Sequence, residues 1–251
     1  AAMAARTATA DEPVARERLT RETARDGLTR LAVGSGVGFL AGALIGGVGG
    51  RLAMLLLRVT SDSSLIGMTT DDGFRTGSFT TDTFFLLAVT AIGGAGLGAA
   101  YVAVRRWLPR GHRPAVAAVV LGAIGGAAII DPEGLDFTVL DPLWLAVAMF
   151  IALPAAFGAA LARGVERLIP WASDRGPSTF GLLVPLLPIV LFPVMAILVG
   201  LVALAWAALR RWPAAGRLWW SAPITVGGRA VGIGATVLAA IVLAQDVAEI
   251  L

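Results

Sequence analysis

The chain has 251 residues, of which 57% are hydrophobic and 15% are charged. A soluble globular domain is about a quarter charged, so this composition argues against an ordinary soluble domain and favours a membrane protein. The absence of cysteine excludes disulfides, thiolate metal sites and cysteine nucleophiles, and the net charge of +3, with no clustered basic groove, argues against a nucleic-acid partner.

The first 30 residues are polar and mix arginine with aspartate and glutamate. This segment is too long and too acidic for the n-region of a signal peptide. We therefore expect residues 1–30 to form a cytosolic tail, partly disordered, in front of a single transmembrane helical domain over residues 31–251.

Six apolar runs follow the tail. A helical span needs about 20 apolar residues to cross roughly 30 Å of hydrocarbon, and its backbone polar groups must be paired within the helix. The predicted fold is an all-α polytopic transmembrane helix bundle of about six spans, with a glycine-rich first helix. The predicted spans cover residues 31–57, 83–104, 114–130, 142–162, 180–209 and 224–244.

The charges between the runs predict an orientation. The 105–113 and 163–175 segments are rich in arginine, whereas the 60–82 and 131–141 segments are mainly acidic. The positive-inside rule then places the tail and both arginine-rich segments in the cytoplasm. Because the basic residues are all arginine and the chain is rich in alanine, glycine and valine, we expect the plasma membrane of a bacterium with a GC-rich genome.

The fifth run leaves two topologies open. If residues 180–209 cross the membrane fully, the last run returns inward and the C-terminus lies with the tail. If Pro185, Pro188 and Pro193 break the run into a re-entrant hairpin, the last run goes outward instead. We expect the full crossing because the apolar run is long.

Glycine recurs every four residues through the first run. Such a stripe lets a neighbouring backbone approach closely, where lipid gives helices no hydrophobic drive to associate. It predicts either packing within the chain or a contact with a protein partner or a second copy. The residues of the stripe are Gly34, Gly38, Gly42, Gly46 and Gly50.

Arg51 follows this stripe near the outer end of the first span. An arginine at this depth costs a few kcal/mol unless it snorkels or is paired. The topology offers three carboxylates at the same face: Asp82, Asp131 and Asp141. Arg51 is either half of a structural ion pair or an anion-binding or gating residue beside a transport pathway.

The sequence shows no catalytic constellation. The single histidine, His112, lies in a loop, so an intramembrane serine nucleophile would lack its base. No catalytic, cofactor or metal site is predicted, and the lipid bilayer is the first expected partner. The expected function is a non-enzymatic accessory or scaffold subunit of a membrane assembly, and the alternative is a small-solute or ion transporter or channel.

Three segments carry a resemblance: RLAMLLLR at 51–58, TTDDGFRTGSFT at 69–80 and QDVAEIL at 245–251. With these, the chain resembles uncharacterised multi-pass membrane proteins of GC-rich, actinobacterial-type bacteria. The resemblance implies a multi-pass membrane fold, and it implies no activity, substrate or cofactor.

Overall fold

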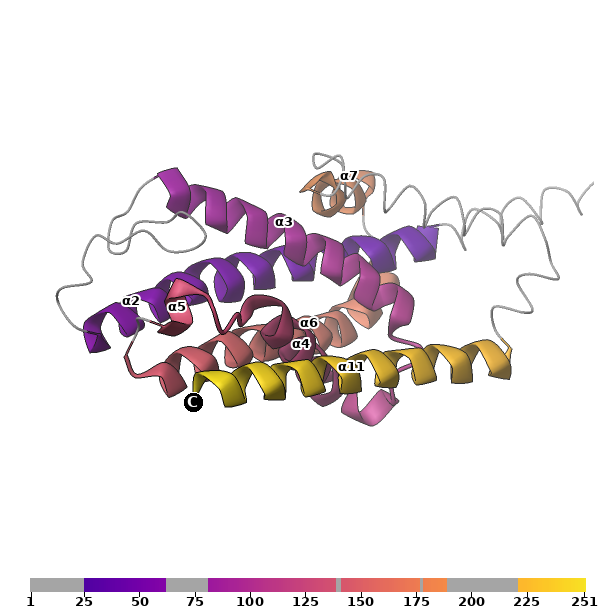
Figure 1. Ribbon diagram of the computed structural model, residues 1–251. Coiled ribbons are helices and arrows are strands. Elements are labelled where there is room, and N and C mark those ends of the chain that lie inside the picture. The colour runs from indigo at the N-terminus through magenta and orange to yellow at the C-terminus, as the bar shows by residue number, and fades with distance from the viewer. Residues whose placement is uncertain (1–24, 62–80, 139–140, 177, 189–220) are drawn as a thin grey trace, which may run out of the picture.

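The computed structural model describes residues 25–61, 81–138, 141–176, 178–188 and 221–251 (Figure 1). The described residues form helices and turns, which confirms the predicted all-α fold. Five helices are long and apolar enough to cross a membrane, close to the six spans expected. The predicted tail up to residue 24, most of the 60–82 segment and residues 189–209 of the fifth run lie outside the described residues. The five candidate spans are Arg25–Thr60, Thr83–Val104, Arg110–Ile129, Leu143–Arg175 and Ala222–Ile250.

The first long helix has three parts. Residues 25–41 are α-helical, Gly42–Gly49 form a π-helix (η1), and α2 covers Gly50–Thr60. Its backbone hydrogen bonds therefore widen from four-residue to five-residue spacing over η1 and tighten again in α2. The helix ends at Ser61, whose hydroxyl lies 3.0 Å from both the backbone nitrogen and the carbonyl oxygen of Asp141.

The remaining helices begin and end at residues that favour helix boundaries. Proline occupies the first turn of α4 and of α11, where its missing N–H costs no hydrogen bond. Gly176, with φ of 59°, ends α6 in the left-handed conformation typical of a helix C-terminus. These elements are α3 (Thr81–Val104), η3 (Arg110–His112), α4 (Arg113–Ile129), α5 (Leu135–Thr138), α6 (Leu143–Arg175), α7 (Thr179–Leu183), η4 (Val184–Leu186) and α11 (Ala222–Ile250).

The long helices share two ends, which we call the tail end and the acidic end. The tail end holds residue 25, the 105–112 turn and the last turns of α6. The acidic end holds the end of α2, the 130–138 segment and the start of α6. Arg105 of the turn bonds Glu166 of α6 at the tail end, and Leu57 packs with Ile130 and Ala146 at the acidic end.

The direction of α11 corrects the favoured topology. Its first turns lie at the tail end, where Arg229 Nε donates to the backbone oxygen of Trp107 at 2.9 Å. Its last turns lie at the acidic end, where Val247 and Ile250 pack against the buried cluster that contains Leu57, and Figure 1 shows the C-terminus near α2 and α5. The expectation of a last run that returns towards the tail is therefore wrong. The direction is the one that the re-entrant alternative required.

A second difference concerns the segment between residues 163 and 175. We expected a cytoplasmic loop there, but α6 continues without a break to Arg175. Buried Val165, Ile169 and Ala172 give this polar stretch an apolar face against the bundle, so the helix persists past the predicted span.

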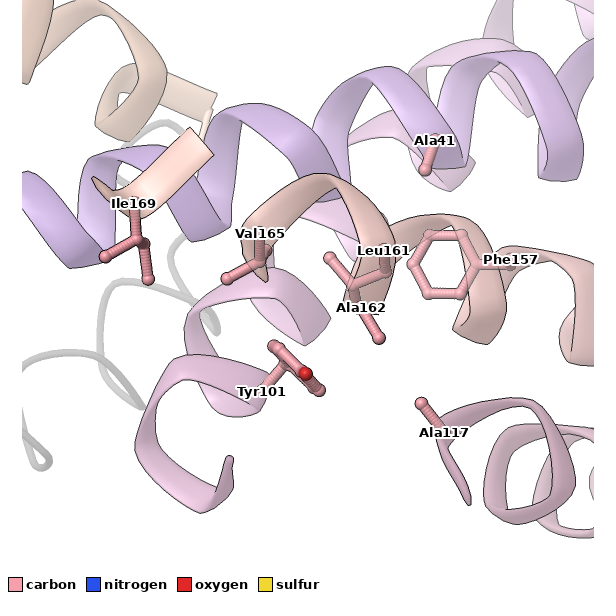
Figure 2. Packing of buried hydrophobic residues seen from close by; sticks show 8 residues of the cluster. All are labelled: Ala41, Tyr101, Ala117, Phe157, Leu161, Ala162, Val165 and Ile169. Atoms are coloured by element: carbon pink, nitrogen blue, oxygen red, sulfur yellow. The ribbon is translucent and has the colours of Figure 1, made fainter. Parts of the chain in front are cut away.

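The main buried cluster follows α6. Figure 2 shows its apolar side chains with Ala41 from the first helix, Tyr101 from α3 and Ala117 from α4. Because one helix contacts three others, α6 forms the centre of the described bundle. The cluster residues from α6 are Phe157, Leu161, Ala162, Val165 and Ile169.

Candidate functional site

The glycine stripe of the first helix lies directly against α3. Gly34 faces the carbonyl oxygen of Gly98, which would be 2.6 Å from a Cβ added at residue 34. A Cβ at Gly38 would overlap the carbonyl oxygen of Gly94, and a Cβ at Gly42 would overlap that of Thr90. The two helices run antiparallel and touch backbone to backbone, as small-residue seams allow in membranes.

The π-helix moves this contact face by one residue. With five-residue hydrogen bonding, the residue one turn beyond Gly42 is Gly47, and both are buried. A Cβ at Gly47 would lie 3.0 Å from the Leu87 side chain, and one at Gly46 would lie 3.1 Å from Cβ of Thr90. No described residue lies within 4 Å of a Cβ built at Gly50. The seam therefore reaches Gly47 and does not extend to Gly50, where the regular four-residue repeat had placed it.

A second antiparallel seam joins α4 to α6. A Cβ at Gly122 would lie 3.1 Å from Cβ of Ala155, and one at Gly125 would lie 2.6 Å from Cβ of Pro154. A Cβ at Gly158 would overlap the carbonyl oxygen of Ala117. Both seams are therefore contacts between helices of the same chain.

The strongest polar cluster lies at the tail end, where α3, α4 and α6 meet. Glu166 of α6 accepts a hydrogen bond from Nε of Arg105 at 2.9 Å and from Nη2 of the same residue at 2.7 Å. It also accepts one from Nη1 of Arg113 at 2.7 Å and one from the Tyr101 hydroxyl at 3.1 Å. We call these four residues the Glu166 cluster.

The Glu166 cluster is largely shielded from solvent. The side chains of Arg113, Arg105 and Glu166 are 11%, 17% and 25% exposed. A carboxylate in this setting gains more from bidentate arginine contacts than it would on an open surface. The donors of all four hydrogen bonds lie outside α6, in α3, in the turn that follows it and in α4. The cluster therefore ties α3, α4 and α6 together.

The arginine-rich turn beside the cluster also carries Arg106 and Trp107. The Arg106 guanidinium carbon lies 5.5 Å from the centre of the Trp107 ring. Desolvation lowers the pKa of the Arg106 guanidinium. The Trp107 ring in turn covers Gly228 of α11, where an added Cβ would lie 2.6 Å from ring carbons. The turn thus joins α11 to the rest of the tail end.

Sequence reasoning missed the Glu166 cluster. The 163–175 segment contains two acidic residues, Glu166 and Asp174, and its expected loop structure gave neither a defined neighbour. The available signal was a glutamate next to apolar Val165 and Ile169, which are four residues apart as on a helix, at the same end of the bundle as the arginines that follow α3.

The predicted charged residues at the acidic end are not brought together by a described bond. Arg51 lies half-buried in α2 and takes part in an interaction, so its charge is not left without a partner. Asp131 is exposed and accepts a hydrogen bond from the backbone nitrogen of Glu133 at 3.1 Å. Asp141 is exposed and holds Ser61 through its backbone. The side chain of Asp82 lies outside the described residues, so its pairing with Arg51 stays a prediction.

Among the residues that the structure describes, no group of three or more histidine, aspartate or glutamate side chains is arranged to hold a metal ion. In the Glu166 cluster, both carboxylate oxygens already accept hydrogen bonds from the side chains of Tyr101, Arg105 and Arg113. Its chemistry is that of an ion-pair clamp between helices.

Comparison with family models, curated proteins and solved structures finds no match for this chain. The fold therefore rests on its own helices. Five of them are long and apolar enough to cross a bilayer, so the chain is a multi-pass membrane protein in contact with lipid.

Proposed function

We propose that this protein is a non-enzymatic accessory or scaffold subunit of a membrane assembly, which holds a fixed helical surface in the bilayer. The observation that carries this proposal is the Glu166 cluster, in which a shielded carboxylate is bonded by three side chains from neighbouring segments. An acid or base in catalysis, or a ligand site, needs a polar group that can change partners. The Glu166 carboxylate already accepts its hydrogen bonds from side chains of the same chain, which favours a role in holding the helices rigidly.

The glycine seams support the same proposal. Backbone contact at Gly38 with Gly94 leaves no room for side chains between the helices, so large sliding movements would break the packing. The partner surface must then lie elsewhere. On α11, no described residue lies within 4 Å of a Cβ built at Gly227, Gly232 or Gly234, which leaves glycine-faced helix surface available.

The proposed setting is the bacterial plasma membrane, with the tail end in the cytoplasm. The support is the excess of arginine at the tail end over the acidic end, in the sense of the positive-inside rule.

The test is purification of a tagged full chain in mild detergent, followed by mass spectrometry of co-purifying proteins and light scattering for its own stoichiometry. A scaffold subunit retains the same protein at a fixed ratio. A Gly234→Leu variant should lose that protein while staying folded. Gly50→Ala serves as the control, because no described residue lies within 4 Å of a Cβ added there. A monomer that retains no protein at any detergent concentration would contradict the proposal.

A second candidate is a small-solute or ion transporter, favoured by one observation. The π-helix Gly42–Gly49 ends two residues before half-buried Arg51, and π-helical turns occur frequently at functional sites. If this function holds, proteoliposomes with the purified chain should accumulate or release an anion, and Arg51→Leu should abolish the flux without changing the yield. Equal flux in protein-free liposomes would eliminate this candidate.

A further inference from the structure

One exposed face of α6 at the tail end carries unneutralised positive charge. Arg163 and Arg167 are four residues apart, which places them one above the other on this face, and both are exposed. Within the described part of the chain, no hydrogen bond or ion pair reaches either guanidinium. The nearest acid in sequence, Glu166, is already engaged by Arg105 and Arg113.

Two like charges one helical turn apart repel each other and weaken the helix slightly. The helix is nevertheless continuous through both residues. An anion that bridges the two guanidiniums would turn this repulsion into attraction, and a phosphate has oxygens enough to contact both.

The same face continues into the bilayer as small apolar side chains. Ala152 and Ala156 precede Arg163 at helical spacing and are exposed. The flanks of the face are closed, since Ala155 packs on Gly122 of α4 and Gly164 packs on Val37 of the first helix. The exposed alanines therefore lie at the depth of acyl chains, directly below the arginine pair.

The residues beyond the pair fit a membrane interface. Trp171 lies one turn after Arg167 and is 54% exposed, and the Arg175 guanidinium lies 4.7 Å from the centre of its ring. Tryptophan and arginine at this level are typical of the headgroup layer.

We propose that Arg163 and Arg167 bind the phosphate of an anionic phospholipid whose acyl chains lie along the alanine face of α6. A soluble phosphate would match the arginines but would leave the alanine face unused. A zwitterionic lipid would match the alanine face, but its own cation would oppose the arginine pair. The anionic phospholipid satisfies both halves of the surface.

The test uses the full chain, purified in a non-ionic detergent and titrated with dioleoylphosphatidylglycerol while native mass spectrometry counts the bound lipid. Dioleoylphosphatidylcholine and inorganic phosphate are titrated in parallel. The unmodified chain should retain phosphatidylglycerol in preference to phosphatidylcholine. Since each arginine near an anionic membrane surface contributes about 1 kcal/mol, Arg163→Gln with Arg167→Gln should weaken retention at least about tenfold.

The matched control is Arg25→Gln with Arg30→Gln, which removes the same charge at the same end from another helix. Arg30 is already paired with Asp26 at 2.9 Å, so this variant should bind phosphatidylglycerol within about twofold of the unmodified chain. If the glutamine pair on α6 fails to fold by gel filtration, Arg163→Lys with Arg167→Lys keeps the charge and should keep most of the binding. Equal loss in both glutamine pairs, equal retention of both lipids, or displacement of the lipid by inorganic phosphate would each overturn the proposal.

Discussion

Glu166 and Arg105 are 61 residues apart in the chain, yet they form a two-bond ion pair with contacts of 2.9 and 2.7 Å. This pair fixes the last turns of α6 against the turn that follows α3. Arg113, at the start of α4, donates a further hydrogen bond to the Glu166 carboxylate. The last turns of α6 are polar and lack a fully apolar interface. The ion pairs of Glu166 with Arg105 and Arg113 hold them to the rest of the tail end.

Replacing Glu166 should destabilise the bundle. Glu166→Gln leaves Arg105 and Arg113 close together in a shielded site without the carboxylate that neutralises them. Breaking a fully buried pair costs about 3 to 5 kcal/mol, and partial exposure lowers the expected loss to about 2 to 3 kcal/mol. Unfolding in mixed micelles with rising dodecyl sulfate measures this free energy.

The control for this variant is Asp174→Asn, which removes one exposed carboxylate from the same helix. It should unfold at the dodecyl sulfate fraction of the unmodified chain. If Glu166→Gln and Asp174→Asn unfold together, the Glu166 cluster does not stabilise the fold.

The seam between the first helix and α3 should not tolerate a single methyl group. Gly38→Ala places a Cβ on the carbonyl oxygen of Gly94, so the helices must separate at a cost of about 1 to 3 kcal/mol. Gly50→Ala, on the same helix with open space around it, should be neutral or slightly stabilising. The same unfolding measurement distinguishes them, and equal stability of the two variants would contradict the antiparallel seam.

Arg51 should be coupled to Asp82. The seam pairs Gly42 with Thr90 and Gly47 with Leu87, and continuing this register brings the backbone of residue 82 level with Arg51. We expect Arg51→Leu and Asp82→Asn each to lower stability, and the double variant to lose less than their sum by about 1 to 3 kcal/mol. Asp131→Asn, on exposed Asp131, should show no coupling with Arg51→Leu. Strict additivity of Arg51 and Asp82 would leave the ion pair without support.

The sequence predicted what depends on local pattern. Apolar runs of about 20 residues gave the positions of α3 and α4 to within a few residues, because span length follows bilayer thickness. The glycine spacing marked the first helix, although the π-helix at Gly42–Gly49 shifted its face near the end. No local feature distinguishes such a π-helix from a glycine-rich α-helix.

Contacts between residues that are far apart in the sequence were not predicted. The partners of Glu166 lie 53 to 65 residues away, and hydrogen bonds across such separations leave no periodic trace. The expected direction of α11 is wrong for another reason. It followed from the length of the apolar run over 180–209, whereas the arginines that precede α11 favour, by the positive-inside rule, the direction that α11 takes. These arginines are Arg210, Arg211 and Arg217.

The C-terminus of the multi-pass bundle lies at the acidic end, opposite the 105–112 turn. The chain has no cysteine, so single cysteines can report on each end without background. The most direct measurement is labelling of Gly111→Cys, Glu133→Cys and Leu251→Cys in intact cells with a membrane-impermeant maleimide. All three native positions are exposed. We predict that residues 133 and 251 react in intact cells and that residue 111 reacts only after the membrane is permeabilised. Reaction at residue 251 that follows residue 111 instead of residue 133 would contradict the described direction of α11, and with it this account of the fold.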